Sequence, residues 1–441
     1  MKDKETEEQS AAVPERAKQA EDILDRWPWV KRCVWSERML WALEKGIKGG
    51  KWFSLIDKVW KMDNLWDGWI SVMINRGSPG VDGQTVRQFN QHVQEGLERL
   101  HEELLDGSYQ PQPVRRVWIP KMGSKELRPL GVPAVRDRIV ESAIRNVIEP
   151  IFERIFAEHS YGFRPGRGCK DALRRVDGLL KQGKTWVVDV DLKSYFDTIP
   201  QDKLLDRMKE QIADGKLLEL LEKYLKAGVL EELKGWQPTE KGTPQGAVIS
   251  PIMANVYLNP LDHLMAAKGY EMTRYADDFV VQCRTQDEAE AALETIRQWS
   301  QENGLTVHPT KTRIVDATQK GGFDFLGYHF EGGMKWPRAK SMDKFRDGIR
   351  NKTRRTQGRS MEEIIAEINP QMRGWYGYFQ HSHWNIFASV DGWVRARLRN
   401  ILRKWQGKRG RAKGTDHQKW TNAYFDKLGL FRLERARGLV P

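Results

Sequence analysis

Two adjacent aspartates between two strand-like segments constrain the fold of this chain more than any other feature. Asp277 and Asp278 follow the polar run Arg274-Tyr275-Ala276 and precede the apolar run Phe279-Val280-Val281. This pattern predicts a β-hairpin with a polar first strand, an apolar second strand and both acids at its tip. Neighbouring carboxylates repel each other and gain nothing from burial unless a cation lies between them. The tip therefore suits a hard divalent cation such as Mg²⁺, which prefers oxygen ligands.

An Asp-Asp pair is also common in turns, so a second acidic segment is needed to favour a metal site. In residues 185–192, alternating apolar side chains predict a half-buried strand with Asp189 and Asp191 together on its other face. Alternation alone does not decide which of these two acids would take part. A strand with one acid beside a hairpin with two would gather three carboxylates around two metal ions, the arrangement that suits in-line phosphoryl transfer.

The two acidic segments resemble the palm motifs of reverse transcriptases, and most of all those of the bacterial group II intron reverse transcriptase/maturases. Further matches follow in family order between about residues 78 and 380. They are Gly80-Val81-Asp82-Gly83, Ile119-Pro120-Lys121, Arg128-Pro129-Leu130-Gly131-Val132-Pro133, Tyr161-Gly162-Phe163-Arg164-Pro165, Gly242-Thr243-Pro244-Gln245-Gly246, Lys311-Thr312 and Phe325-Leu326-Gly327. The resemblance implies an α+β right-hand polymerase. Its fingers and antiparallel palm sheet would pack on helices, and a helical thumb or maturase domain would follow.

The resemblance also implies roles for the acids. Asp191, Asp277 and Asp278 would be the catalytic, metal-binding set, holding two Mg²⁺ ions for which Mn²⁺ could substitute. Asp191 is preferred to Asp189 because the family's catalytic acid stands five residues before an aromatic, here Phe196. That ring would pack under the sugar and disfavour a ribonucleotide 2′-hydroxyl, unless it only fills the core.

The remaining implied site residues hold the nucleotide and the primer. A hairpin predicted from about residue 114 carries Lys121 and Arg128, cations that could offset triphosphate charge. Without the resemblance both would be taken as solvated surface. By resemblance, Gln245 and Gly246 would lie at the nucleotide or template, Lys311 would protonate the departing pyrophosphate, and three further residues would grip the primer end. These three are Phe325, Leu326 and Gly327.

The positive charge of the chain lies mostly in its C-terminal part. The formal net charge is +13, and residues 338–441 contain 24 Lys and Arg against 9 Asp and Glu. Such a surplus favours a nucleic-acid partner. The spacing of Arg395, Arg399 and Arg403 predicts a helix face that tracks phosphates, although a basic helix face can also be merely solvated. Other candidate nucleic-acid contacts are Arg138, Arg164, Arg350, Arg354, Arg355, Arg373 and Trp375.

These patterns predict four segments. Residues 1–20 should be a disordered tail, 21–76 a helical extension rich in tryptophan, 77–335 the fingers and palm, and 336–441 the basic helical thumb or maturase domain, with no endonuclease domain. The tryptophans of the extension could stack on single-stranded bases or fill a small core. The chain contains three widely separated cysteines, no membrane-length apolar run and no signal peptide, which predicts a cytoplasmic protein that binds no membrane.

Two functions from different classes fit these patterns. One is RNA-templated DNA synthesis with dNTPs, an RNA template and a DNA primer or target, by a monomer or homodimer. The other is an RNA-binding splicing cofactor that stabilises folded intron RNA, for which the basic surface would suffice without the acids. The family resemblance implies both in one protein. A domesticated or defence-associated relative is a third possibility.

Overall fold

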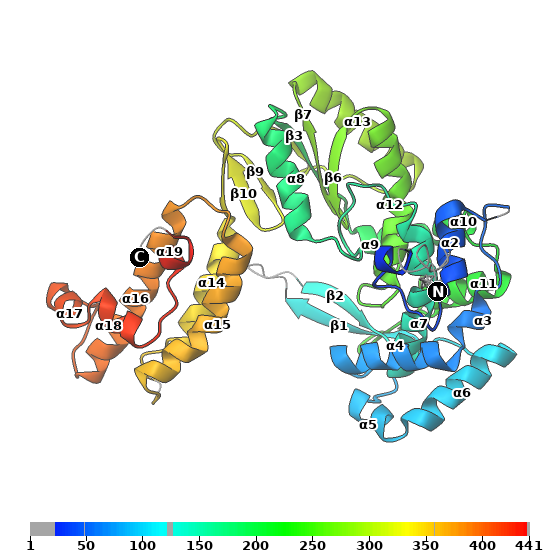
Figure 1. Cartoon of the computed structure of the whole chain (residues 1–441), viewed down its shortest axis with the longest axis horizontal. Helices are drawn as coiled ribbons and strands as arrows, with labels where there is room; N and C mark the ends of the chain where they lie inside the picture. Colours follow the sequence, from blue (N-terminus) through cyan, green and yellow to red (C-terminus); the bar gives the residue numbers. More distant parts are fainter. Residues whose placement is uncertain (1–22, 48, 121–126, 357, 439–441) are drawn as a thin grey trace, which may run out of the picture.

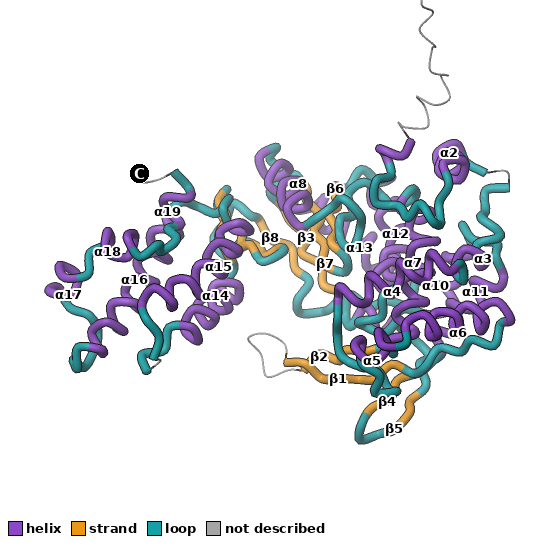
Figure 2. The backbone as a smooth tube through the Cα atoms, turned by 60° about the horizontal axis from the view of Figure 1, so that its bottom comes forward, coloured by secondary structure: helices purple, strands orange, loops and turns teal. Residues whose placement is uncertain are grey.

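A computed structural model describes residues 23–47, 49–120, 127–356 and 358–438. The predicted tail 1–20 and the candidate Lys121 lie outside the described residues. The chain forms a mixed α and β structure in which the helices after β11 are set apart from the fingers and palm (Figures 1 and 2). Among the described residues, no helix is both long and apolar enough to cross a membrane.

The palm is an antiparallel sheet covered by helices on both faces. Its strand order is β6-β7-β3-β8, with β3 at Trp186–Asp191, β6 at Glu271–Tyr275, β7 at Asp278–Cys283 and β8 at Arg313–Asp316. Val187 and Val280 face a core shared with helix α8 (Cys169–Lys181), whereas Val188 and Val281 face the core shared with α12 (Ser250–Ala267) and α13 (Gln286–Glu302). The predicted alternation holds from Val188 to Asp191, where the two valines are buried and Asp189 and Asp191 lie half-buried on the other face; it fails at Val187, which α8 covers.

The fingers combine a four-stranded sheet with a helical layer. Strands β1 (Val114–Pro120) and β2 (Leu127–Val132) form the predicted hairpin, and β1 also pairs in parallel with β4 (Val229–Glu231), which continues to β5 (Gly235–Gln237). The central helix is α7 (Val135–Glu153), whose side chains are almost all buried. Further helices are α5 (Val86–Gln91), α6 (Val93–Asp106), α9 (Tyr195–Thr198), α10 (Gln201–Lys209) and α11 (Gly215–Lys226). Helices α5 and α6 are separate because His92 between them has a φ of −131°, which is not helical.

The tryptophans of the N-terminal extension serve the core. The extension contains α2 (Glu37–Lys45), α3 (Ile56–Val59) and α4 (Met62–Asn75), and α4 packs along α7. Trp35 and Trp69 are buried, and the indole N–H of Trp35 donates to the Asn146 carbonyl at 3.0 Å. The other six described tryptophans before residue 70 are half-buried against the same core. Of the two roles considered for these residues, core filling is the one that the packing supports.

The C-terminal part begins with a small sheet and continues as helices. The sheet order is β11-β10-β9, from β9 at Phe323–Phe325, β10 at Tyr328–Glu331 and β11 at Met334–Pro337, so the sheet crosses the boundary expected at residue 335. The helices are α14 (Ala339–Lys352), α15 (Met361–Phe379), α16 (Asn385–Trp405), α17 (Gly414–Lys419), α18 (Asn422–Lys427) and α19 (Leu433–Ala436). They enclose a core that continues into the α8 face of the palm.

Candidate active site

The acidic residues meet where β3 lies beside β7. The register pairs Asp191 with Asp278, and residues paired in this way have Cα atoms about 4.5 to 5.5 Å apart. Asp277 occupies the two-residue turn between β6 and β7, next to Ala276, whose φ is +59°. The structure thus brings Asp191, Asp277 and Asp278 to the same end of the palm sheet. Asp189 lies two residues back along β3 and receives the Arg313 guanidinium at 3.3 Å.

The hairpin tip is fixed from below by residues that the sequence did not single out. Arg274 lies in the first strand, which the sequence predicted to be polar, and it is fully buried. Its guanidinium pairs with Asp262, which accepts from Nε at 2.8 Å, and Nη1 donates to Asn255 Oδ1 and to the Ala276 carbonyl, each at 2.9 Å. Gly162 lies against the turn so closely that a Cβ there would be 2.3 Å from the Ala276 nitrogen.

Burial and mutual repulsion raise the pKa values of the carboxylates at the hairpin tip. Displacement of water, followed by the charges of Asp189, Asp277 and Asp191, raises the pKa of Asp278 to about 7, while Arg338 opposes the shift. Part of Asp278 still contacts solvent at the tip. Burial also raises the pKa of Asp277, and Arg128 opposes that shift. Repelling carboxylates of this kind are stabilised by a nearby cation.

The carboxylates at the hairpin tip are chemically suited to bind a divalent metal ion. The donor set consists of carboxylate oxygens, which are the ligands that Mg²⁺ and Mn²⁺ take, together with room for substrate phosphates. Among the residues described by the structure, no three His, Cys, Asp or Glu side chains already converge as a closed ligand cluster. Asp191 instead interacts with Lys311, whose Nζ lies 3.5 Å from its Oδ2; the Lys311 side chain is exposed and Asp191 is half-buried.

An open cleft lies between the acids and the fingers sheet. Asp191 and Asp277 line it together with cations of the fingers, of the β3 end and of the loop before β8. These cations are Arg116, Arg128, Lys193, Lys241 and Lys311. Opposed charges around one open cleft provide binding groups for both a metal and a polyphosphate.

Three of the predicted nucleotide residues, Arg128, Phe196 and Gln245, line this cleft. Arg128 Nε donates to Gln245 Oε1 at 2.8 Å, which joins the fingers hairpin to the loop before α12. Gly246, with φ at +113°, lies against β2 so tightly that a Cβ would be 2.4 Å from the Gly131 carbonyl oxygen. Phe196 is 7% exposed and lines the cleft, so it packs in the core and borders the site at once.

The predicted primer-grip residues form the turn between β9 and β10. Phe325 is buried, and Leu326 and Gly327 have positive φ values of 45° and 84°. The Leu326 carbonyl accepts from the Tyr378 hydroxyl of α15 at 2.7 Å, and the Gly327 carbonyl accepts from the Arg338 amide at 2.9 Å. The turn is therefore tied to the helices that follow it.

The predicted arginine stripe on α16 is wrong. Arg395 and Arg399 are 7% and 4% exposed, and Arg399 donates to the Trp420 carbonyl at 2.8 Å and to Asn422. Arg403 pairs with Asp416 at 2.6 Å. These three cations hold α16 to the segments from α17 to α19 instead of facing nucleic acid.

Three other candidate contacts are also internal. Arg138 donates to the Arg76 and Ser78 carbonyls, Arg164 pairs with Glu153, and Trp375 is a core residue at 8% exposure. Four of the candidate arginines do face solvent, and these are Arg350, Arg354, Arg355 and Arg373.

Comparison with known families agrees with this geometry. Residues 119–330 match the family described as reverse transcriptase (RNA-dependent DNA polymerase), and residues 342–420 match the maturase-specific domain of group II introns. Protein YkfC of Escherichia coli K12 is 36% identical over 290 residues, which cover 57% of this chain and 75% of YkfC. The group II intron-encoded protein LtrA of Lactococcus lactis is 42% identical over 192 residues, 43% of this chain but only 31% of LtrA.

Solved structures resemble the chain more distantly. Telomerase from Candida albicans is matched at 11% identity with a TM-score of 0.43, over 78% of this chain and 68% of that one. A Cas6-RT-Cas1–Cas2 complex is matched at 23% identity and a TM-score of 0.37, over 56% and 26%. The acidic tip, the two matched domains and the similarity to YkfC all point to the same family. The chain therefore belongs to the group II intron reverse transcriptase/maturases, a family of RNA-directed DNA polymerases.

Proposed function

We propose that this chain extends a DNA primer along an RNA template, with Asp191, Asp277 and Asp278 as its catalytic acids. In this reaction the primer 3′-hydroxyl attacks the α-phosphate of a dNTP and pyrophosphate leaves. The observation that carries the proposal is the β3–β7 register, which sets Asp191 opposite Asp278 beside the cation-lined cleft.

The donor set supports two divalent ions, Mg²⁺ or Mn²⁺, at this tip. When bound, such ions supply neutralisation of phosphate charge and activation of the primer hydroxyl. The residues of the chain then position the reactants. Arg128 and Gln245, joined by their hydrogen bond, border the triphosphate, and Phe196 underlies the sugar and disfavours a 2′-hydroxyl.

Lys311 is the proposed proton donor to pyrophosphate. Its ammonium lies 3.5 Å from the Asp191 carboxylate, and both residues line the cleft. The Leu326–Gly327 turn, which is fixed to α15 and to the start of α14, would hold the primer end.

Primer extension on an RNA template tests the proposal with a matched pair of variants. Asp191→Asn and Asp189→Asn remove one charge each from the same strand, but Asp189 is bound to Arg313 whereas Asp191 lies opposite Asp278. Asp191→Asn should reduce dNTP incorporation by about 10³-fold or more, and Asp189→Asn should stay within several-fold of the unaltered chain. Equal losses in both variants would contradict the choice of Asp191.

We also propose that the chain assists splicing by binding intron RNA. The maturase-specific match and the exposed Arg350, Arg354, Arg355 and Arg373 support this second activity. Because these arginines lie outside the acidic tip, Asp277→Asn should abolish DNA synthesis and leave intron splicing support intact. Loss of both activities together would mean that the acids serve more than catalysis.

A further inference from the structure

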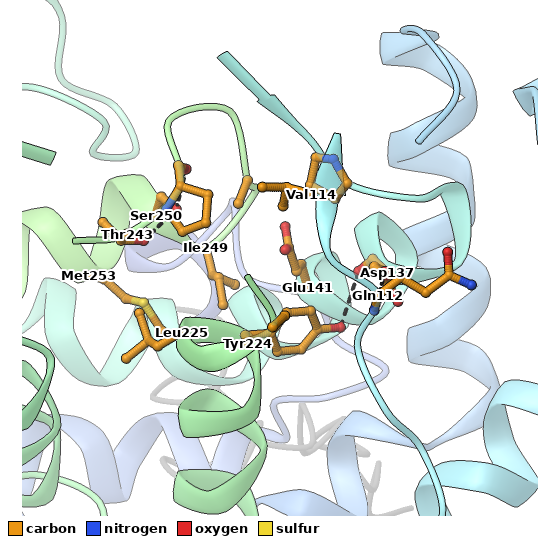
Figure 3. A pocket seen from close by; sticks show the side chains of 14 residues that line it. Gln112, Val114, Asp137, Glu141, Tyr224, Leu225, Thr243, Ile249, Ser250 and Met253 are labelled. Atoms are coloured by element: carbon orange, nitrogen blue, oxygen red, sulfur yellow. Dashed lines mark hydrogen bonds between the residues drawn. The ribbon is translucent and has the colours of Figure 1, made fainter. Parts of the chain in front are cut away.

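The loop that carries Gln245 is fixed from behind by a buried carboxylate. Glu141 lies on α7, is 2% exposed, and accepts a hydrogen bond from the Val248 amide. In Figure 3 its side chain points into a small cavity, between Ile249 on one side and Asp137 on the other. None of the motifs that indicate the function includes Glu141.

The front of the same loop faces the nucleotide side. The Gly131 amide of β2 donates to the Gln245 carbonyl at 2.7 Å, and the Gln245 side chain accepts from Arg128. Behind the loop, the Thr243 and Ser250 hydroxyls lie 2.6 Å apart, and Ser250 donates to the Pro244 carbonyl at 2.8 Å. Among the described side chains of α7, Glu141 is the one with a hydrogen bond to the loop, and β2 makes a hydrogen bond to the loop from the opposite side.

A cavity behind the loop leaves room for the loop to move if the hydrogen bond between Val248 and Glu141 is lost. It is lined by the loop, by β1 and by α7 and α11, among them Val114, Tyr224 and Ala247. Protein interiors are close-packed, so a void behind a loop is space into which the loop can move once its anchor is lost. A movement of the loop at Gln245 would displace the groups that border the nucleotide and weaken dNTP binding in the ground state and the transition state alike, which raises the KM for dNTP more than it lowers kcat.

We propose that Glu141 is a positioning residue for the incoming nucleotide, acting through the Val248 amide and thereby through Gln245. The proposal rests on the dNTP site described above. The part of Glu141 that acts is its acceptor oxygen, not its charge. Glutamine keeps an acceptor of the same reach, whereas methionine keeps the volume and loses the acceptor.

Steady-state incorporation of one dNTP by the full chain separates these contributions. Glu141→Met should raise the KM for dNTP by about tenfold or more, with kcat changed much less, and Glu141→Gln should stay within about threefold of the unaltered chain. Glu149→Met is the matched control, because Glu149 lies two turns further along α7 and has no hydrogen bond to the loop among the described residues. It should leave the KM for dNTP unchanged.

Amide hydrogen exchange provides a readout that does not depend on polymerase activity. The Val248 amide should be protected in the unaltered chain and in Glu141→Gln, and it should exchange faster in Glu141→Met while the core of α7 stays protected. Rapid exchange of Val248 in the unaltered chain would overturn the proposal even if Glu141→Met failed to fold. So would a loss in Glu141→Gln as large as that in Glu141→Met. Protection without any dNTP incorporation would contradict the polymerase proposal alone.

Discussion

Replacing Arg274 should destabilise the protein more than any surface substitution, because it leaves a buried carboxylate without its partner. Arg274 is fully buried and Asp262 is 6% exposed. Removing one member of such a pair typically costs about 3 to 5 kcal/mol. The acceptors Asn255 Oδ1 and Ala276 O would also lose their donor, each for about 1 kcal/mol. We expect Arg274→Met to lower the free energy of unfolding by about 5 to 7 kcal/mol.

The double variant Arg274→Met/Asp262→Leu tests whether the isolated charge is the cause. With both charges removed, most of the lost stability should return, because buried ion pairs contribute little over well-packed apolar residues. Urea denaturation of both variants, with the slope of the transition compared, measures this. The exposed pair Arg207–Glu210, at 2.9 Å, is the control, and Arg207→Met should change stability by less than about 1 kcal/mol.

Activity should not follow stability in this series. The Ala276 carbonyl loses its donor in the single and in the double variant, so the turn that bears Asp277 loses an anchor in both. Primer extension should remain reduced in the double variant after its stability has recovered. A loss below about 1 kcal/mol in Arg274→Met, or a double variant no more stable than the single one, would refute the reasoning.

Three further predictions concern the turn, the buried acid and the arginines. Gly162→Ala should destabilise by about 1 to 3 kcal/mol and reduce primer extension, because its Cβ would meet the Ala276 nitrogen, whereas Gly178→Ala, with open space around it, should do neither. Burial raises the pKa of Glu141 to about 8, above its ordinary value of 4.5, so its contribution to stability is full below pH 4.5 and is lost as the pH rises to 8. Each pH unit between the two pKa values changes the free energy of unfolding by about 1.4 kcal/mol. Urea denaturation should therefore find Glu141→Gln as stable as the unaltered chain near pH 4.5 and more stable by a few kcal/mol at pH 8.5. Parallel pH profiles of the two proteins would contradict this. Arg399→Met should lower the melting temperature and leave the salt dependence of RNA binding unchanged, whereas Arg355→Met should reduce the slope of log K against log salt by about one and leave the melting temperature unchanged.

The sequence predicted the acidic hairpin because the features that form it are local. Alternation in β3 and the apolar run of β7 define the strands, and the turn needs only the two residues between Tyr275 and Asp278. The sequence pattern alone did not show how deeply the residues of each strand are buried. The burial of Arg274 depends on Asp262 and Asn255 of α12, which are distant in sequence, so its neighbours in the chain gave no sign of it.

The arginines of α16 show a second limit. Spacing identifies which residues share a helix face, but it does not tell whether that face meets solvent or protein. Here the short helices α17 to α19 cover it, and helices of four to six residues leave a weak sequence signal. The β4–β5 hairpin was missed for a related reason, because each strand has three residues and β4 pairs with β1 across more than a hundred residues.

The turn between β9 and β10, which is proposed to hold the primer end, is hydrogen-bonded to the helices that follow it. Its carbonyls are bonded to the Tyr378 hydroxyl of α15 and to the Arg338 amide at the start of α14. If α14 and α15 rotate when a duplex advances by one base pair, the turn must move with them. Stepping along the template and release of the primer end would then be a single mechanical event.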